Sequence, residues 1–337
     1  MDGVLVLEKP AGPTSHDMVA LVRRLTGTRR VGHGGTLDPF ATGVLPLFLG
    51  SATRMLEYHL GDGKAYRATV CFGASSTTDD LEGELTPAAS APVRAEVDRA
   101  LARFRGSIEQ QPPSYSAIKV AGRRAYAMAR AGQRPDLQPR SVTITRLDLV
   151  SWDDLDPARP VAILDVECSA GTYIRALARD LGRAAGSEAY LGALIRTASG
   201  PFELATAHQV EEVRRAAEAG PDALAALLLP PDAGLERLPA VQLNEGETSA
   251  VARGQFIRST GLSREARESG LPLRLFDARG RLVGIGAVRD GRVVPEKVLI
   301  GADRARPSRQ DEVEAAVLAD RDPGPDIDPD PASSDDA

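Results

Sequence analysis

The chain has few of the residues from which several common kinds of site are built. Its 337 residues include two cysteines, one tryptophan and four histidines, and aromatic residues make up only 4%. Cys71 and Cys168 lie far apart and cannot form a zinc site by themselves, so each is expected to act as a small buried hydrophobic residue. No apolar run approaches the roughly 18 residues of a membrane span, and the first residues do not resemble a signal peptide. We therefore expect a cytoplasmic protein without a membrane segment.

Two motifs for nucleotide cofactors are also missing. Gly63-Lys64 is followed by alanine and lacks the upstream glycine of a phosphate-binding loop, and Gly32-His33-Gly34 leads to Leu37 instead of a third glycine. The histidine, glutamate and cysteine pattern of the zinc deaminases does not occur either. The sequence therefore predicts neither a cofactor nor a metal ion.

The negative net charge is concentrated at the C-terminal end. The formal charge of the whole chain is −6, but the segment from Asp303 onward contains eleven acidic and four basic residues. The first 302 residues contain 37 basic and 36 acidic side chains and are close to neutral. The acidity of the chain therefore does not exclude a nucleic-acid partner for its main part.

What the sequence does contain is a short loop that presents one carboxylate. Residues 31–43 read VGHGGTLDPFATG, with adjacent glycines at Gly34 and Gly35 and a proline directly after Asp38. The glycines permit backbone angles that side chains forbid, and the proline favours an extended conformation of Asp38. Asp38 is the only acidic residue within positions 18–56, which suggests a lone carboxylate acting as a nucleophile or as an orienting group. On pattern alone, a plain turn explains the same residues.

Positive charge precedes this loop. Arg23 and Arg24 end a predicted helix, and Arg29 and Arg30 follow it. Such a cluster is either a solvated surface or a binding surface for a polyanion, and the sequence favours neither.

Hydrophobic periodicity predicts a chain of mixed α and β structure. The predicted strands cover residues 3–8, 65–72, 142–149 and 161–168, and helices are predicted from Thr14 or Ser15, over 52–58, near 93–104, around 123–126, from 174, and over 206–219 and 221–229. Alternating runs such as 273–277 and 282–288, separated by Asp-Gly turns, predict hairpins of a small β-barrel.

Residues 32–43 resemble the signature loop of the TruB family, the bacterial tRNA pseudouridine synthases that modify a uridine of the T loop. Further stretches that resemble family blocks follow in order: 64–68 (KAYRA), 110–119 (QQPPSYSAIK), 168–175 (CSAGTYIR) and 191–202 (LGALIRTASGPF). The resemblance covers about residues 3–210 and, more loosely, 238–301. One departure is Thr77, where the family commonly has an aspartate.

The resemblance implies an α+β pseudouridine synthase fold, in which helices flank a mixed, largely antiparallel sheet, followed by a small PUA-like β-barrel. We expect a catalytic domain over residues 1–230, a PUA-like RNA-binding domain over 238–301, and an acidic tail over 302–337. The tail contains almost no large apolar residues after Leu318, a composition typical of disorder.

Three catalytic residues follow from the resemblance. Asp38 is implied as the covalent nucleophile, and Arg175 as its ion-pair partner. Tyr66 is implied to stack on the target base near C5. Without the family, the pattern also allows plain structural roles. Arg175 would then be the first of a solvent-facing row with Arg179 and Arg183, and Tyr66 would be a core residue of a strand. Both uracil C6 and ribose C1′ are possible points of attack for Asp38.

The resemblance also implies residues that bind the substrate or support the site. Lys9, in an N-terminal family motif, supports the site without reacting, His33 helps to hold the flipped nucleotide, and Leu194 lines the base pocket. The remaining residues predicted to contact the substrate belong to the loop itself: Gly34, Gly35 and Thr36. Plain structural roles, as a loop histidine or a core leucine, fit the pattern of His33 and Leu194 as well.

The predicted activity is the isomerisation of a T-loop uridine to pseudouridine by a monomeric enzyme, with the T stem-loop of tRNA as partner. Two other classes remain possible. A non-catalytic RNA-binding or RNA-folding protein would use the same fold and the C-terminal barrel, but it would have no need of Asp38, Tyr66 and Arg175, whose presence argues against it. An N-glycosidase would share a carboxylate and the broken bond but would release free uracil.

Overall fold

A computed structural model describes residues 1–115, 119–120, 123–124, 128, 133, 137–258 and 262–300. Backbone contacts divide the chain into two compact units, the first over residues 1–239 and the second from Ala240 onward. The predicted tail over 302–337 lies outside the described residues. Among the described helices, none is long and apolar enough to cross a membrane.

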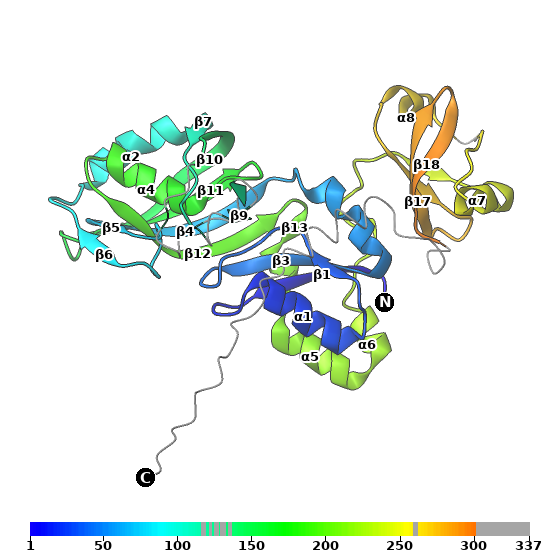
Figure 1. The fold of residues 1–337 in the computed structure, drawn as a ribbon, viewed down its shortest axis with the longest axis horizontal. Coiled ribbons are helices and arrows are strands. Elements are labelled where there is room, and N and C mark those ends of the chain that lie inside the picture. Colours follow the sequence, from blue (N-terminus) through cyan, green and yellow to red (C-terminus); the bar gives the residue numbers. More distant parts are fainter. Residues whose placement is uncertain are drawn as a thin grey trace, which may run out of the picture. The chain divides into compact units, whose positions relative to one another are not determined.

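The first unit is built on one large mixed sheet (Figure 1). Its strands, in spatial order, are β14 (His208–Gln209), β1 (Gly3–Lys9), β3 (Thr42–Leu49), β12 (Ala189–Ser199), β4 (Lys64–Phe72), β11 (Val161–Cys168), β10 (Arg140–Asp153) and β7 (Gly106–Gln110), with β2 (Val31–His33) paired to β3 and β13 (Phe202–Glu203) paired to β12. Only the pairs β1–β14 and β3–β12 are parallel. The predicted fold, a largely antiparallel mixed sheet with flanking helices, is therefore present.

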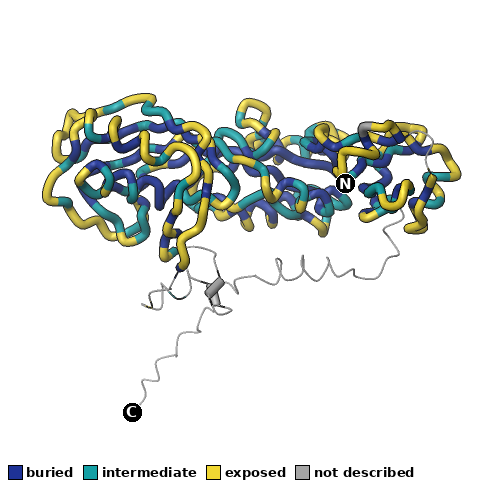
Figure 2. Tube along the Cα trace, turned by 90° about the horizontal axis from the view of Figure 1, so that it is seen from above, coloured by how far each residue is buried: buried dark blue, intermediate teal, exposed yellow. Residues whose placement is uncertain are grey.

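Helices cover the two halves of this sheet (Figure 1). Beside the half that begins at β1 and β3 lie α1 (Ser15–Thr26), α5 (Val210–Ala219) and α6 (Pro221–Ala225), and beside the half formed by β4, β11 and β10 lie α2 (Arg94–Leu101) and α4 (Ile174–Ala184). Each half has its own apolar core, and buried residues lie in the interior while exposed residues lie on the outside (Figure 2). The boundary between the two halves is the β3–β12 pair.

The shorter elements complete this unit. They are the 3₁₀ helices η1 (Gly50–His59), η2 (Ala102–Phe104) and η3 (Leu204–Thr206), and the short strands β5 (Ala74–Ser76), β6 (Leu85–Pro87), β8 (Lys119–Val120) and β9 (Arg123–Arg124). The helix predicted around 123–126 is wrong at its start, because the backbone of Arg123 and Arg124 pairs with Val120 and Lys119 in a hairpin. The helix predicted from Thr206 begins only at Val210, after η3 and β14.

Helix α1 shows how local sequence signals place the site. Thr14 caps it, accepting a hydrogen bond from the Asp17 backbone, while the Asp17 carboxylate accepts from the Thr14 backbone N–H at 2.7 Å. This capping box fixes where the helix begins. As a result Ser15 and His16, in the first turn, have defined positions beside the loop that carries Asp38.

The second unit contains a four-stranded sheet of β15 (Ala240–Gln242), β16 (Leu273–Phe276), β17 (Leu282–Arg289) and β18 (Arg292–Val298), with α7 (Glu245–Ala252) and α8 (Arg264–Glu268). The Asp-Gly turns predicted as hairpin signals join its strands. Asp290 and Gly291 both adopt positive φ, at 50° and 70°, which is the backbone of a tight hairpin turn. An isolated bridge between Ile257 and Val293 extends the sheet.

Candidate active site

Asp38 lies on the loop between β2 and β3, where the two halves of the sheet meet. Only two residue pairs join β3 to β12 at this point, Thr42 with Ile195 and Gly43 with Arg196. Gly43 has a φ of 103°, and a Cβ there would collide with the backbone of Arg196, so glycine is required for this junction. The loop therefore emerges from the centre of the sheet.

The loop glycines differ from each other. Gly35 adopts a φ of 134°, a conformation that side chains rarely adopt, whereas Gly34 has no positive φ. The sequence offers this conformational freedom at both positions, and of the two glycines only Gly35 uses it. A Cβ on Gly34 would make ordinary contacts with Phe48 and Pro46, so its backbone is compatible with a side chain.

Two buried polar side chains fix the backbone on both sides of Asp38. The Ser15 hydroxyl donates to the carbonyl of Leu37 at 3.1 Å and accepts from its N–H at 2.9 Å. The Lys9 ammonium donates to the carbonyl of Pro39 at 3.0 Å and to that of Pro10 at 2.8 Å. Lys9 is fully buried, which lowers its pKa to about 8 despite the nearby charge of Asp38. The structure thus places Lys9 where it supports the loop.

Arg175 pairs with Asp38 through two contacts. Its Nε lies 3.0 Å from Oδ2 of Asp38, and its Nη2 donates to Oδ1 at 3.2 Å. The Arg175 side chain is 9% exposed and that of Asp38 is 34% exposed. Arginine suits this position because its planar fork can hold a carboxylate at both oxygens. The sequence-predicted pair is therefore in contact, with one side of the carboxylate left accessible.

A second carboxylate shares the same arginine. Nη1 of Arg175 lies 3.3 Å from Oδ2 of Asp80, which is buried on the loop after β5. The guanidinium also donates to the carbonyls of Thr78 and Tyr115, at 3.3 and 3.0 Å. The sequence interpretation missed Asp80, because it lies 42 positions after Asp38 and only the tertiary structure brings it near.

The charge balance raises the pKa of Asp38. Burial is the largest cause, and the negative charge of Asp80 adds to it. Arg175 lowers the pKa by charge and hydrogen bonding, and Lys9 lowers it by charge. The carboxyl of Asp38 is therefore poised above the range of an ordinary aspartate, as is common for reactive groups.

The three arginines of the predicted row on α4 differ in how far they are buried. Arg179 is also turned inward, with its Nη1 2.9 Å from Oδ2 of Asp79, whereas Arg183 is 59% exposed. The start of α4 is held by Gln110, whose buried amide exchanges two hydrogen bonds with the backbone of Tyr173, at 3.0 and 2.8 Å. The alternative that all three arginines face solvent is therefore wrong for Arg175 and Arg179, and Arg183 alone of the three is exposed.

Tyr66 and Leu194 lie on neighbouring strands at the same junction. Tyr66, on β4, pairs in register with Arg196 on β12 and with Val166 on β11. Its ring packs against the apolar core, and burial raises the pKa of its hydroxyl. Leu194 is 7% exposed and belongs to the same core. Both residues therefore contribute to packing. Both also lie close to the start of β3, the strand that follows the Asp38 loop.

His33 is held at the start of the loop as a neutral ring. Its Nδ1 accepts from the N–H of Gly35 at 3.3 Å, and its ring meets that of His16 edge-on, with centroids 5.3 Å apart. Burial, His16 and Arg196 together lower the pKa of His33 to about 4. At neutral pH it therefore offers an uncharged imidazole. Thr36, the next predicted contact residue, is exposed.

Arg196 is a second residue that the sequence interpretation missed. Its side chain is 1% exposed and donates to the carbonyls of Val44, Thr36 and Gly35, at 2.7, 3.3 and 3.0 Å. The signal in the sequence was an arginine inside an otherwise apolar strand segment, LGALIRTAS.

Thr77, the noted departure from the family pattern, is exposed and accepts a hydrogen bond from the Glu84 backbone at 3.0 Å.

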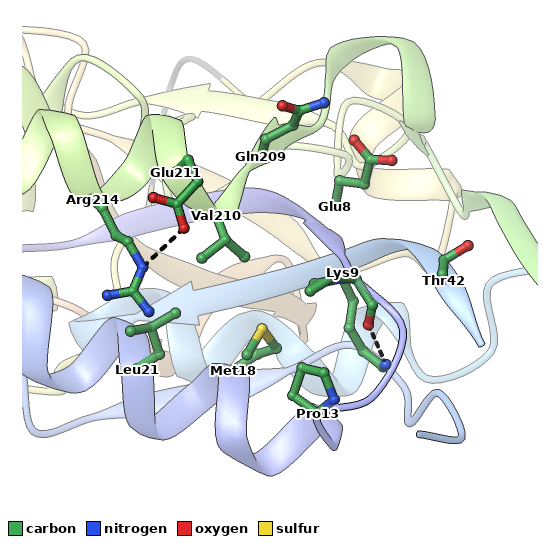
Figure 3. A pocket seen from close by; sticks show the side chains of 11 residues that line it. Glu8, Lys9, Pro13, Met18, Leu21, Thr42, Gln209, Val210, Glu211 and Arg214 are labelled. Carbon is green, nitrogen blue, oxygen red and sulfur yellow. Dashed lines mark hydrogen bonds and ion pairs between the residues drawn. The ribbon is translucent and has the colours of Figure 1, made fainter. Parts of the chain in front are cut away.

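A separate cavity of about 540 Å³ lies between β1, α1 and α5 (Figure 3). Met18, Leu21 and Val210 form apolar walls, and Glu211 pairs with Arg214 at its edge at 3.3 Å. Lys9 contributes to its lining, but the ammonium bonds the carbonyls of Pro10 and Pro39 instead. The lining contains none of the predicted catalytic residues, so this cavity is not the candidate active site.

The described residues contain no group of three or more histidine, cysteine, aspartate or glutamate side chains arranged to hold a metal ion. The candidate site therefore contains a carboxylate that an arginine holds on a rigid loop, and a partly buried tyrosine on the neighbouring strand β4. This arrangement suits nucleophilic attack.

Comparison with known proteins identifies the family. Residues 23–174 match the family model described as "TruB family pseudouridylate synthase (N terminal domain)", and residues 175–236 and 239–299 match two TruB C-terminal domain models. The tRNA pseudouridine synthase B of Pseudomonas aeruginosa (strain UCBPP-PA14) is 45% identical over 302 residues, which cover 89% of this chain and 96% of that protein. The chain belongs to the TruB family of pseudouridine synthases.

Other TruB relatives and solved structures agree. The tRNA pseudouridine synthase B of Symbiobacterium thermophilum is 48% identical over 257 residues, covering 75% of this chain and 82% of that protein. The crystal structure of a Cbf5-Nop10-Gar1 complex contains a chain that matches with a TM-score of 0.64 and 26% identity, over 89% of this chain and 86% of that one. The resemblance inferred from the loop and the predicted fold class are therefore both confirmed.

Proposed function

We propose that this TruB-family protein converts a uridine in the T loop of tRNA to pseudouridine, with Asp38 as the nucleophile. The observation that carries the proposal is the two-point contact between Asp38 and Arg175 on a loop whose backbone is fixed on both sides by Ser15 and Lys9. The names of the relatives, which are tRNA pseudouridine synthases, support tRNA as the substrate.

The reaction cuts the bond from ribose C1′ to uracil N1, turns the base in place and joins C5 to C1′. A base inside folded RNA must first be flipped out, which costs a few kcal/mol. Asp38 then forms the covalent intermediate, and Arg175 keeps its carboxylate ionised and oriented. The partly exposed side of Asp38 is where the base would enter, with Tyr66 and Leu194 forming the neighbouring wall.

Contacts to the RNA would come from both units. His33 and Thr36 lie at the start of the loop, and the exposed Arg29 and Arg30, at the other end of β2, would add positive charge for the RNA backbone. The second unit, from Ala240 onward, is proposed as a PUA-like RNA-binding domain, and the enzyme as a monomer that needs no cofactor.

The test of this function is release of the C5 hydrogen. An unmodified tRNA T stem-loop with uridine tritiated at C5 should lose label to water when the protein is added, and the product should contain pseudouridine at one loop position. Free uracil in the product would show an N-glycosidase instead. Tight binding of the stem-loop without release of label or base would show a non-catalytic RNA-binding protein.

The raised pKa of Asp38 predicts a pH dependence. Because the nucleophile must be ionised, kcat/KM should fall as the pH drops through that raised pKa, at higher pH than for an ordinary aspartate. The Asp80→Asn substitution removes a negative charge that raises this pKa, so the acid limb of the profile should move to lower pH. A pH–rate series on both proteins measures the shift. An acid limb that stays in place or moves to higher pH would contradict the assignment.

The hydroxyl of Ser15 should matter through the loop backbone. In Ser15→Ala the buried N–H and carbonyl of Leu37 lose their partner, which costs about 1–3 kcal/mol for an unsatisfied group. We expect a lower thermal midpoint and a kcat reduced about tenfold or more, because a misplaced reactive group costs rate steeply. Ser107→Ala is the control, since the Ser107 hydroxyl contacts the hydroxyl of Ser141 on an exposed strand, away from the loop. Equal behaviour of the two variants would exclude a role of Ser15 in the loop.

A further inference from the structure

Before the acidic tail, the excess of positive charge belongs to the second unit. Residues 240–300 contain ten basic and seven acidic side chains, whereas residues 1–239 contain 27 basic and 29 acidic ones. Three of the ten, Arg258, Arg289 and Arg292, come together at the turn end of the hairpin formed by β17 and β18 (Figure 1). We call these three residues the arginine row.

Strand pairing places the members of the row next to one another. Arg289 and Arg292 are direct partners across β17 and β18. Ile257 bridges Val293 in antiparallel register, with N–H to carbonyl bonds of 2.9 Å in both directions, so Arg258 comes opposite Arg292. Ile257 and Val293 are buried in the core of the unit, and their chain neighbours therefore point to the outer face. The row runs across three chain segments on that face.

The fold by itself gains nothing from this row. Like charges that lie directly opposite each other on neighbouring strands are destabilising. Arg289 has a carboxylate partner in Glu296, at 2.8 Å. None of the ion pairs between described residues of this unit includes Arg258 or Arg292. A negatively charged partner from outside the chain would compensate the charge that the fold leaves in place.

An exposed aromatic ring lies beside the row. Phe256 is 51% exposed, and Cζ of Arg292 lies 4.4 Å from the centre of its ring, so the guanidinium stacks on the ring. Phe256 directly precedes Ile257 and so shares the outer face with Arg258. Proteins that bind single-stranded nucleic acid use this combination, in which bases stack on aromatic rings and arginines contact the backbone phosphates.

We propose that Phe256 and the arginine row form an RNA-binding surface, on which an unpaired base of the tRNA stacks beside Phe256 and Arg292 while Arg258 and Arg289 bind neighbouring phosphates. This rests on the proposed function, which supplies tRNA as the partner. The surface provides affinity and takes no part in the chemistry, because it contains none of the residues that contact Asp38. A polyanion without bases would meet the arginines but would gain nothing from the ring.

The first test is a binding titration of the full-length protein with an unmodified tRNA transcript between about 50 and 200 mM salt. Arg258→Gln and Arg292→Gln should each weaken binding and reduce the slope of log affinity against log salt by about 0.7–0.9. Phe256→Leu, which keeps an apolar side chain, should weaken binding about fivefold or more with the slope unchanged, and Phe256→Tyr should bind like the parent.

Two variants of the same unit are the controls for this titration. Arg264→Gln removes an 88% exposed arginine that pairs with Glu268 on α8, and Leu271→Ala removes a 44% exposed apolar side chain. Both should leave the affinity and its salt dependence near the parent values. Arginine variants of the row that bind tRNA like the parent, or that lose no more affinity than Arg264→Gln, would overturn the proposal.

Inorganic polyphosphate, a chain of phosphates without bases, separates the two parts of the surface. Its affinity should fall in Arg258→Gln and Arg292→Gln and stay unchanged in Phe256→Leu. Equal losses of polyphosphate and tRNA affinity in Phe256→Leu would show that the ring only supports the arginines, and would overturn base stacking. The thermal midpoint of Arg258→Gln should not fall, because the substitution removes a like-charge contact.

Kinetics distinguish this proposal from the proposed function. In the tritium-release assay the variants of the row should raise KM and leave kcat within twofold of the parent, as expected for a loss of binding alone. A reduced kcat with unchanged tRNA affinity would overturn the proposal. A parent protein that binds tRNA but releases no tritium would refute the proposed function, whereas weaker tRNA binding by the variants would still establish the surface.

Discussion

The Asp38→Asn substitution should reduce turnover by about 10⁴-fold or more, because the amide cannot act as the nucleophile. Affinity for the T stem-loop should stay within a few-fold of the parent, since the change is isosteric and leaves the loop backbone bonds to Ser15 and Lys9 in place. Tritium release under single-turnover conditions and a binding titration measure the two quantities. Substantial turnover by this variant would exclude Asp38 as the nucleophile.

The same substitution should not destabilise the fold. The pKa of Asp38 is raised above its unfolded value, so the folded state binds its proton more tightly, and this carboxyl costs stability as the pH rises through that window. A neutral amide removes that cost at neutral pH, which gives a thermal midpoint equal to or above that of the parent. Asp98→Asn, at an exposed helix position, is the control for removing a carboxylate. A large loss of both folding and RNA binding in Asp38→Asn would make Asp38 a structural residue.

The Arg175→Lys substitution should reduce kcat by about 10²–10³-fold, although it keeps the positive charge. The shorter point charge of lysine cannot contact both oxygens of Asp38 and also reach Asp80 and the carbonyls of Thr78 and Tyr115. Asp38 would then be held less firmly beside a second carboxylate. We also expect the acid limb of the pH profile to move to higher pH, because the stabilisation of the ionised Asp38 is weaker. Kinetics across the pH range measure both effects.

Arg183→Lys supplies the control for the arginine substitution. Arg183 lies on the same helix two turns further on, is 59% exposed and pairs only loosely with Glu188, at 3.5 Å. Its replacement should leave kcat and KM near the parent values. Similar losses of kcat in Arg175→Lys and Arg183→Lys would show that activity depends on an intact helix α4 and not on Arg175 in particular. An acid limb of the pH profile that does not move in Arg175→Lys would contradict the electrostatic role of Arg175.

Much of the molecule could be predicted from the sequence, because local signals decide it. The strand at β1, the capped start of α1 at Thr14, and the Asp-Gly hairpin turn of the second unit depend on residues within a few positions of each other. The loop around Asp38 and its resemblance to the TruB signature are also local, and the comparisons confirm the family. The roles of Asp38, Tyr66 and Arg175 stay predictions, now supported by their contacts.

The environment of those residues was decided only by the tertiary structure. Asp38 is a lone carboxylate within positions 18–56, yet the fold places Asp80 on the same arginine, and this second charge helps to raise the pKa of Asp38. Arg196, 158 positions after Asp38 in the chain, reaches the loop because β12 pairs with both β3 and β4. The sequence by itself determined which reactive groups the chain carries and the loop that presents one of them. Which charges surround each group, and hence its pKa and its orientation, depended on strand pairing, because electrostatic and hydrogen-bond energies are set by distance in space and not along the chain.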